Sequence, residues 1–168
     1  MLEVARMRLE AAGVAERVRL ITSSFEGFVP EAEGVAPVDV VFSSYALHHL
    51  RPEVKRGVLK RMLSLLKPGG WFLNADLVSH ADPGVEAVIQ RVRVDGIVAR
   101  NVASSRPQSR FADAAHVREF LDGLEEGEGD CPLTVEEDLA LLRAVGVSSP
   151  TVFWQEYREV VMGGWKGR

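Results

Sequence analysis

The sequence has little cysteine, no long apolar run and no large excess of positive or negative charge. One cysteine, Cys131, among 168 residues excludes an internal disulfide framework and fits a reducing compartment. No apolar run approaches the roughly 18 residues of a membrane helix, and no basic-then-apolar leader opens the chain. With 20 Lys and Arg against 24 Asp and Glu, the net charge is -4, so no global basic field favours nucleic acid. We therefore expect a cytoplasmic protein with no membrane partner.

The composition is that of an ordinary globular chain of one domain. Hydrophobic residues make up 46% and charged residues 26% of the sequence, and the length suffices for one sizeable core but not for two. Residues 2–12 are rich in strong helix formers and predict a helix that stops at Gly13. Residues 18–22 are of β type. Residues 38–42 are almost continuously apolar, which predicts a strand buried on both faces.

A parallel strand pair follows from the next segment of the chain. Pro52 suits the first turn of a helix, and apolar spacing continues that helix to about Leu66. Residues 67–70 (KPGG) predict a tight break before a strand at 71–74. Two strands with an amphipathic helix between them make a βαβ unit, so a parallel sheet is the economical interpretation.

The second half of the chain alternates helices with loops. Residues 83–101 show helical apolar spacing, and another helix is predicted over 112–124. Between them, residues 102–111 are predicted to form a loop. The acidic stretch 125–130 is expected to be flexible.

The last forty residues carry the start and stop signals of a helix, followed by a predicted hairpin. Thr134 and Glu137 form a capping-box pattern, which predicts a helix that runs to about residue 145 and stops at Gly146. Residues 151–157 and 159–163 predict two strands, which should be antiparallel neighbours because so few residues separate them. The whole order of elements predicts an α/β layered domain.

Four ordered segments resemble the C-terminal two-thirds of a class I S-adenosylmethionine-dependent methyltransferase. Each is weak alone, but the ordered set is specific. In chain order they are MLEVARMRLEAAGVAERVRLITSSFEGF, VDVVFSSYALHHL, LLKPGGWFLNADLV and LTVEEDLALLRAVGVSSPTVFWQEYREVVMGGWK.

The resemblance implies a fold and a cofactor. It implies one partial domain over residues 1–168 with a Rossmann-like sheet, mostly parallel, that ends in an antiparallel hairpin and carries a variable helical insertion at about 80–131. It also implies an N-terminal truncation, because the family's Gly-rich loop and the acidic residue that binds the ribose have no counterpart here. Binding of S-adenosylmethionine is therefore expected to be weak or absent.

The resemblance assigns cofactor contacts to two turns. Ser43, Ser44 and Tyr45 follow the 38–42 strand, where ligands of α/β sheets bind, and would lie against the methionine part of the cofactor. The alternative is a plain turn in which serine caps the next helix. Ser24 stands where the family commonly has an Asp that binds adenine, and Phe25 would either stack on the adenine or belong to the core.

Histidines and one carboxylate are the candidates for chemistry. His48 and His49 match the family's LHHL signature and could orient a substrate or take a proton; alternatively, one packs under the following helix and the other is solvated. Asp76 ends the 71–74 strand and either faces substrate or caps the next segment. A metal held by these residues and His80 has no ligand-spacing motif to support it, so we predict no metal site.

The remaining expectations concern the core, partners and function. The methyl acceptor is expected to be a small molecule or tRNA, and an unpaired sheet edge would favour self-association. The alternative function is a non-catalytic interaction module that has lost cofactor binding. The five arginines between residues 84 and 110 would attract the acidic residues of 119–138 or contact an anionic substrate. Four aromatic residues are predicted in the core rather than in a site: Trp71, Phe72, Trp154 and Trp165.

Overall fold

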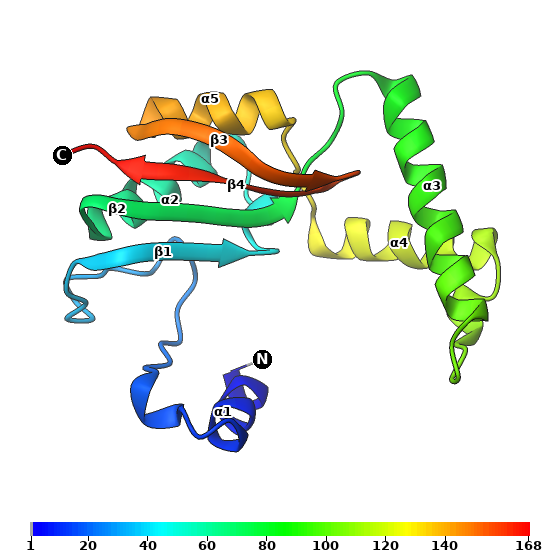
Figure 1. Cartoon of the computed structure of the whole chain (residues 1–168), viewed down its shortest axis with the longest axis horizontal. Coiled ribbons are helices and arrows are strands. Elements are labelled where there is room, and N and C mark those ends of the chain that lie inside the picture. Colours follow the sequence, from blue (N-terminus) through cyan, green and yellow to red (C-terminus); the bar gives the residue numbers. More distant parts are fainter. Residues whose placement is uncertain (1) are drawn as a thin grey trace. The chain divides into compact units, whose positions relative to one another are not determined.

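A computed structural model describes residues 2–168 of the chain. Their contacts divide the chain into two compact units, residues 1–35 and residues 36–168, which are described separately (Figure 1). The larger unit is an α/β fold with a four-stranded sheet. The predicted α/β class is confirmed, whereas the prediction of a single partial domain stays a prediction.

The smaller unit is helical and irregular. Helix α1 (Leu2–Ala11) is followed by Gly13 at φ +67° and a short 3-10 turn, η1 (Ala15–Arg17). The predicted strand at 18–22 is wrong, because the structure gives these residues no regular secondary structure. A strand exists only with a hydrogen-bonding neighbour, and these residues pair with none of the four described strands.

The larger unit is built on a mixed sheet. Strands β1 (Val38–Ser44) and β2 (Leu66–Leu77) are parallel and are joined by α2 (Pro52–Leu65), which confirms the predicted βαβ unit. Strands β3 (Val147–Glu156) and β4 (Glu159–Lys166) form the predicted antiparallel hairpin. The order is β1-β2-β4-β3. The described sheet therefore has one parallel pair and two antiparallel pairs, a smaller parallel part than expected because residues 18–22 do not join it.

The predicted break at 67–70 lies inside β2 rather than before it. Val38 pairs with Leu66 and Val40 pairs with Trp71, so four residues of β2 bulge out opposite one residue of β1. Gly69 permits the bulge because its φ is +80°, a conformation that side chains with a Cβ rarely adopt.

Helices α2 and α5 (Val135–Val145) cover one face of the sheet. The capping box at Thr134 and the left-handed Gly146 bound α5 as predicted. Lys55 of α2 and Asp138 of α5 form a buried ion pair of 2.7 Å between Nζ and Oδ1. The core between these layers includes Leu59, Leu63, Leu66, Phe72, Leu142, Val160 and Met162.

The opposite face of the sheet exposes large apolar side chains, which corrects two predictions. Residues 38–42 are not buried on both faces, since Val40 is 51% and Phe42 63% exposed. Of the four aromatics predicted in the core, only Phe72 is buried. The exposed side chains on this strand surface include Trp71, Phe153 and Trp165, and the Trp71 ring lies 5.5 Å from that of Trp165.

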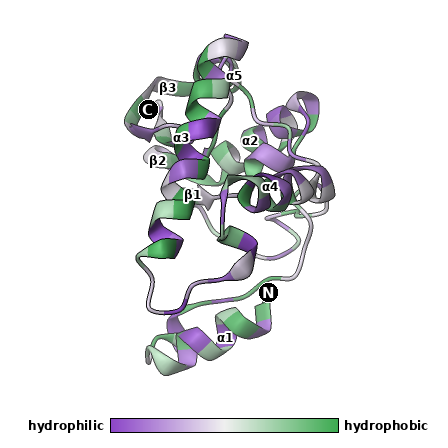
Figure 2. Cartoon of the chain, turned by 90° about the vertical axis from the view of Figure 1, so that its right-hand side faces the viewer, coloured by the Kyte–Doolittle hydropathy of each residue, from purple (hydrophilic) through white to green (hydrophobic). Residues whose placement is uncertain are grey.

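A helical pair lies beyond the carboxyl ends of β1 and β2 (Figure 1). Helices α3 (Pro83–Val102) and α4 (Ala114–Glu128) pack through Val94, Val117 and Leu121, and the 3-10 turn η3 (Ser109–Phe111) lies in the connection. Hydrophobic and hydrophilic residues alternate along α3 (Figure 2).

The predicted flexible acidic stretch at 125–130 is wrong for most of its length. Helix α4 continues to Glu128 and ends at Gly129, which has φ +68°. Glu125 is held by two arginines, since its Oε1 accepts a 3.0 Å hydrogen bond from the buried Arg158 and lies 3.3 Å from Arg93 Nη1. Acidic character alone indicated disorder, whereas these guanidinium groups stabilise the helix end.

Candidate active site at the carboxyl ends of β1 and β2

The predicted polar turn at 43–45 begins inside β1, since Ser43 and Ser44 are the last two residues of the strand and only Tyr45 follows it. Ser43 is buried, Ser44 and Tyr45 are exposed, and Tyr45 adopts φ +47°. The Tyr45 N–H donates a 2.8 Å hydrogen bond to the Ala75 carbonyl of β2. Non-glycine residues in this conformation are strained and are often found at functional sites. The hydrogen bond to β2 holds Tyr45 in this conformation.

Asp76, near the end of β2, is buried among hydrogen-bond donors. Its Oδ2 accepts hydrogen bonds from the Leu47 N–H at 3.1 Å and from the Asn74 amide at 3.2 Å, and its Oδ1 accepts one from the Leu77 N–H at 3.0 Å. Burial opposes ionisation of the carboxyl group, but these donors and His48 outweigh it and hold the pKa of Asp76 below its ordinary value. Asp76 is therefore ionised at neutral pH.

His48 is the partner of that carboxylate. The residue lies in a 3-10 turn, η2 (Leu47–His49), and its Nδ1 is 2.5 Å from Asp76 Oδ1, with both side chains buried. Since an ionised Asp76 can only accept, Nδ1 carries the proton of this hydrogen bond and Nε2 points away from Asp76. The predicted substrate-facing role of Asp76 stays a prediction, because the described contacts of its carboxylate are with His48 and with the Leu47, Asn74 and Leu77 donors.

Asp130 completes the cluster, and the sequence interpretation missed it. Its Oδ1 lies 2.9 Å from His49 Nδ1 and 3.6 Å from His48 Nε2. A 2.7 Å hydrogen bond from the Cys131 N–H to the His48 carbonyl holds this segment against η2. No signal in the sequence connects residues 130 and 48, because their proximity depends on where α4 ends.

Two cavities adjoin this end of the sheet. One, of about 200 Å³, is lined by residues that include Tyr45, His48, His49, Arg93 and Asp130. The other, of about 350 Å³, is lined by residues that include Arg93, Arg100, Trp154, Tyr157 and Glu159. Arg93 borders both cavities, so the two spaces are neighbours.

Tyr45 is a poor proton acceptor at this site. Partial burial and, next, the Glu159 carboxylate raise its pKa above the usual value of about 10. The phenol therefore stays protonated at neutral pH, so Tyr45 is not a candidate for the proton acceptor.

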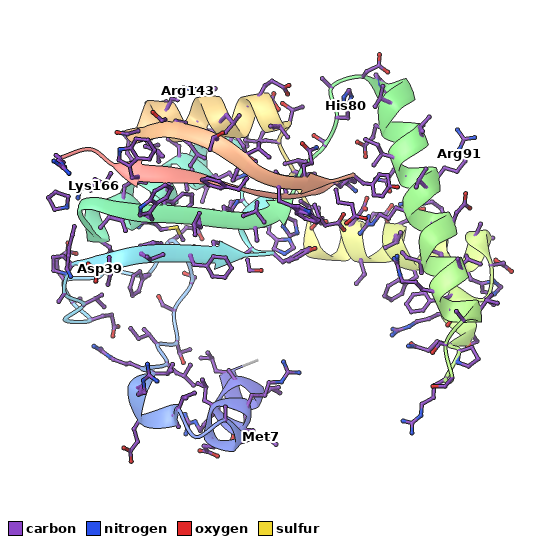
Figure 3. All side chains as sticks on the ribbon, in the orientation of Figure 1. Met7, Asp39, His80, Arg91, Arg143 and Lys166 are labelled. Atoms are coloured by element: carbon purple, nitrogen blue, oxygen red, sulfur yellow. The ribbon has the colours of Figure 1, made fainter. Side chains whose placement is uncertain are left out.

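The other predicted site residues belong to other segments of the chain. Ser24 and Phe25 belong to the smaller unit, where Ser24 Oγ accepts a 3.0 Å hydrogen bond from the Gly27 N–H. His80 lies in the loop before α3 (Figure 3), and its Nδ1 accepts a hydrogen bond from the Asp82 N–H. Of the predicted residues, the structure thus brings together Ser43, Ser44, Tyr45, His48, His49 and Asp76 at one end of the sheet.

Comparison with protein families identifies the first part of the chain. The model of a methyltransferase domain matches residues 1–70. This match agrees with the resemblance to the class I methyltransferase family that the sequence predicts. A search of the curated protein sequences finds no match.

Solved methyltransferase structures share the fold. An O-methyltransferase family protein from Burkholderia thailandensis is 15% identical, with a TM-score of 0.62 over 98% of this chain and 40% of that one. An O-methyltransferase family 2 protein from Planctomyces limnophilus, solved with apigenin, is 14% identical, with a TM-score of 0.61 over 98% and 39%. PigF, solved with SAH, is 16% identical, with a TM-score of 0.59 over 96% and 39%. The chain thus spans about two-fifths of the length of these three proteins.

Within residues 2–168, no helix combines the length and the apolar character that crossing a bilayer requires.

Proposed function

We propose that this methyltransferase chain takes part in S-adenosylmethionine-dependent methyl transfer and that His48 is the general base. The observation that carries the proposal is the buried 2.5 Å contact between His48 Nδ1 and Asp76 Oδ1 beside a cavity of about 200 Å³. A histidine held by an ionised carboxylate presents its second nitrogen to an acceptor proton in one fixed tautomer.

The chemistry of the turn after β1 fits one part of the cofactor. Ser43 and Ser44 place hydroxyl groups at the carboxyl end of β1, where they are suited to the amino group of a methionine moiety. Ser24 and Phe25, proposed for the adenine part, lie in the separately described smaller unit. The larger unit by itself therefore supports a site for the methionine part.

In the proposed reaction, this chain orients the acceptor and removes its proton. When bound, S-adenosylmethionine supplies a methyl group on a positively charged sulfur. As the acceptor oxygen or nitrogen bonds to that methyl group and the carbon–sulfur bond breaks, His48 Nε2 takes the acceptor's proton. Asp76 stabilises the resulting imidazolium through Nδ1. The products are the methylated acceptor and S-adenosylhomocysteine.

A small molecule is the acceptor class that the cavities favour over tRNA. The neighbouring cavity of about 350 Å³ has the size of a small-ligand site. Trp154 and Tyr157 offer aromatic faces there, and Arg100 offers a cation. The net charge of -4 gives no global attraction to tRNA phosphates.

The direct test measures transfer of a labelled methyl group from S-adenosylmethionine to a panel of phenols, aromatic acids and tRNA. We expect the His48→Asn change to lower the rate about 10²- to 10⁴-fold, the range for loss of a general base. The matched control is His116→Asn, because His116 also pairs with an aspartate, Asp113, at 2.9 Å but on the surface. Equal rates for His48→Asn and the unchanged chain would contradict the base role.

Two further results of the same assay distinguish the alternatives. If Arg100→Met raises KM for an anionic small acceptor while Arg106→Met does not, the larger cavity is the acceptor site. Absence of both S-adenosylhomocysteine binding and transfer to any acceptor would instead support a non-catalytic interaction module that has lost cofactor binding.

A further inference from the structure

His48, His49 and Asp130 form a cluster with the composition of a transition-metal site. One ligand atom from each of the three residues lies within 4.8 Å of the other two, and Asp130 Oδ1 faces both His48 Nε2 and His49 Nδ1. Adjacent histidines usually point apart, but the tight turn Leu47–His49 brings these two rings to a centroid distance of 3.9 Å. The two imidazoles present different nitrogens, Nε2 and Nδ1, to the same carboxylate oxygen.

The spacing of these atoms suits a tetrahedral ion. Bonds of about 2.0–2.1 Å at tetrahedral angles place neighbouring ligand atoms about 3.4 Å apart. The two described distances to Asp130 Oδ1, 3.6 Å from His48 Nε2 and 2.9 Å from His49 Nδ1, lie on either side of that value. Small side-chain rotations would equalise them.

An outer hydrogen bond already prepares one ligand. Asp76 accepts the Nδ1 proton of His48, which fixes the tautomer that leaves Nε2 able to bind a metal. Carboxylate–histidine–metal arrangements of this kind orient the ring and raise its basicity. Asp76 itself is occupied by the Leu47, Asn74 and Leu77 donors, so it acts behind His48 and is not a ligand.

An ion can also reach the cluster. The side chain of His49 is 31% exposed and that of Asp130 is 11% exposed, and all three residues line the cavity of about 200 Å³. Three protein ligands beside a cavity leave a fourth position for water or another small ligand.

We propose that His48, His49 and Asp130 bind a divalent transition-metal ion of the zinc class, and that this ion switches off the His48 base. Two imidazoles and one carboxylate select such ions over magnesium or calcium, which prefer oxygen ligands. The ion would bind the same Nε2 lone pair that takes the acceptor proton. His48 therefore cannot bind the ion and act as the base at the same time. Binding of the ion does not depend on the proposed function, whereas the inhibition rests on it.

The binding test uses the untagged chain and needs no activity. Zn²⁺ affinity is measured by competition with a chromophoric chelator. We expect a 1:1 complex with Kd at or below about 10 μM, and at least about 10-fold weaker binding after His49→Ala or Asp130→Asn, since each removes one of three ligands. His116→Ala and Asp113→Asn alter a surface pair of the same chemistry and should leave the affinity unchanged.

A second measurement uses the unchanged chain and needs no variant. Co²⁺ bound to the unchanged chain should give the visible absorption bands of a four-coordinate site with nitrogen and oxygen ligands, and Zn²⁺ should abolish them. Failure of the chain to bind Zn²⁺ below about millimolar, or equal losses in His49→Ala and His116→Ala, would overturn the site. Zn²⁺ binding without inhibition of methyl transfer would contradict the switch while leaving the site intact.

Discussion

The two faces of the sheet differ in how far their side chains are buried. One face lies under α2 and α5 and buries Phe72, Val160 and Met162. The other carries Trp71, Phe42 and similar side chains that the described residues leave substantially exposed. Because side chains alternate along a strand, neighbours in sequence belong to different environments. The same covered face continues into Asn74 and Asp76, so the polar site is an extension of the core.

The largest expected difference is between two neighbours in β2. Phe72→Ala should lower the free energy of unfolding by about 3–5 kcal/mol, because it leaves a cavity under α2 and α5. Trp71→Ala should cost less than half as much, since the indole is 40% exposed. Urea denaturation of both variants measures the contrast. Equal losses would mean that the exposed face is covered in solution.

Removing one partner of a buried ion pair should likewise lower the free energy of unfolding far more than removing one partner of an exposed pair. Lys55→Met removes one partner of the buried pair with Asp138, and we expect a loss of about 3–5 kcal/mol because a buried carboxylate is left without its cation. Burial raises the pKa of Asp138 against the opposing effect of Lys55, so Asp138 should become still easier to protonate in this variant.

The matched control is Lys67→Met, at the exposed 2.8 Å pair between Lys67 Nζ and Asp39 Oδ1. Asp39 lies at the end of the sheet opposite α3 (Figure 3). We expect a change within about 0.5 kcal/mol. A Lys55→Met loss no larger than that of this control would contradict the packing of α2 against α5.

The start of the covering helix α5 should contribute a smaller, pH-dependent amount. Thr134→Ala removes the capping box and should cost about 1 kcal/mol in thermal or urea unfolding. Hydrogen bonds from the Thr134 backbone and then its side chain lower the pKa of Glu137. A lowered carboxyl pKa stabilises the fold at pH values above the ordinary Glu value, and this contribution is lost as the pH falls through the folded-state pKa. Losing the side-chain donor should make that loss smaller in the variant.

The smallest effect on stability is expected on the uncovered face. Phe42→Ser should change the free energy of unfolding by about 0.5 kcal/mol or less, because the ring is exposed at the edge strand β1. It should nevertheless reduce concentration-dependent self-association, measured by sedimentation, if this edge and face are where copies meet. Unchanged self-association would place that contact elsewhere.

Local signals predicted most of the covered layer. The Pro52 start of α2, the capping box of α5 and the short connection before β4 each act within a few residues, so the sequence was sufficient. Strand 18–22 failed because a strand depends on a distant neighbour. The prediction that β1 is buried on both faces was wrong for a related reason. An apolar run shows that a strand can be buried, but it does not show which other elements cover the strand.

The site was predictable in part for the same reason. Residues 43–45, 48, 49 and 76 follow strands whose carboxyl ends meet, and the topology brings them together. Asp130 was missed because it reaches the histidines only when α4 ends where it does and Arg158 holds Glu125. Acidic composition suggested a flexible segment, whereas long-range ion pairs decide its position.

The most direct test of this account is the tautomer of His48, measured by long-range proton–nitrogen NMR of the whole chain. If the covered face ends in a buried dyad, His48 should show one stable tautomer with the proton on Nδ1, and Asp76→Asn should change its nitrogen shifts while those of His116 stay fixed. An Nε2-protonated His48, or shifts that ignore Asp76→Asn, would contradict the site on which the proposed methyl transfer rests.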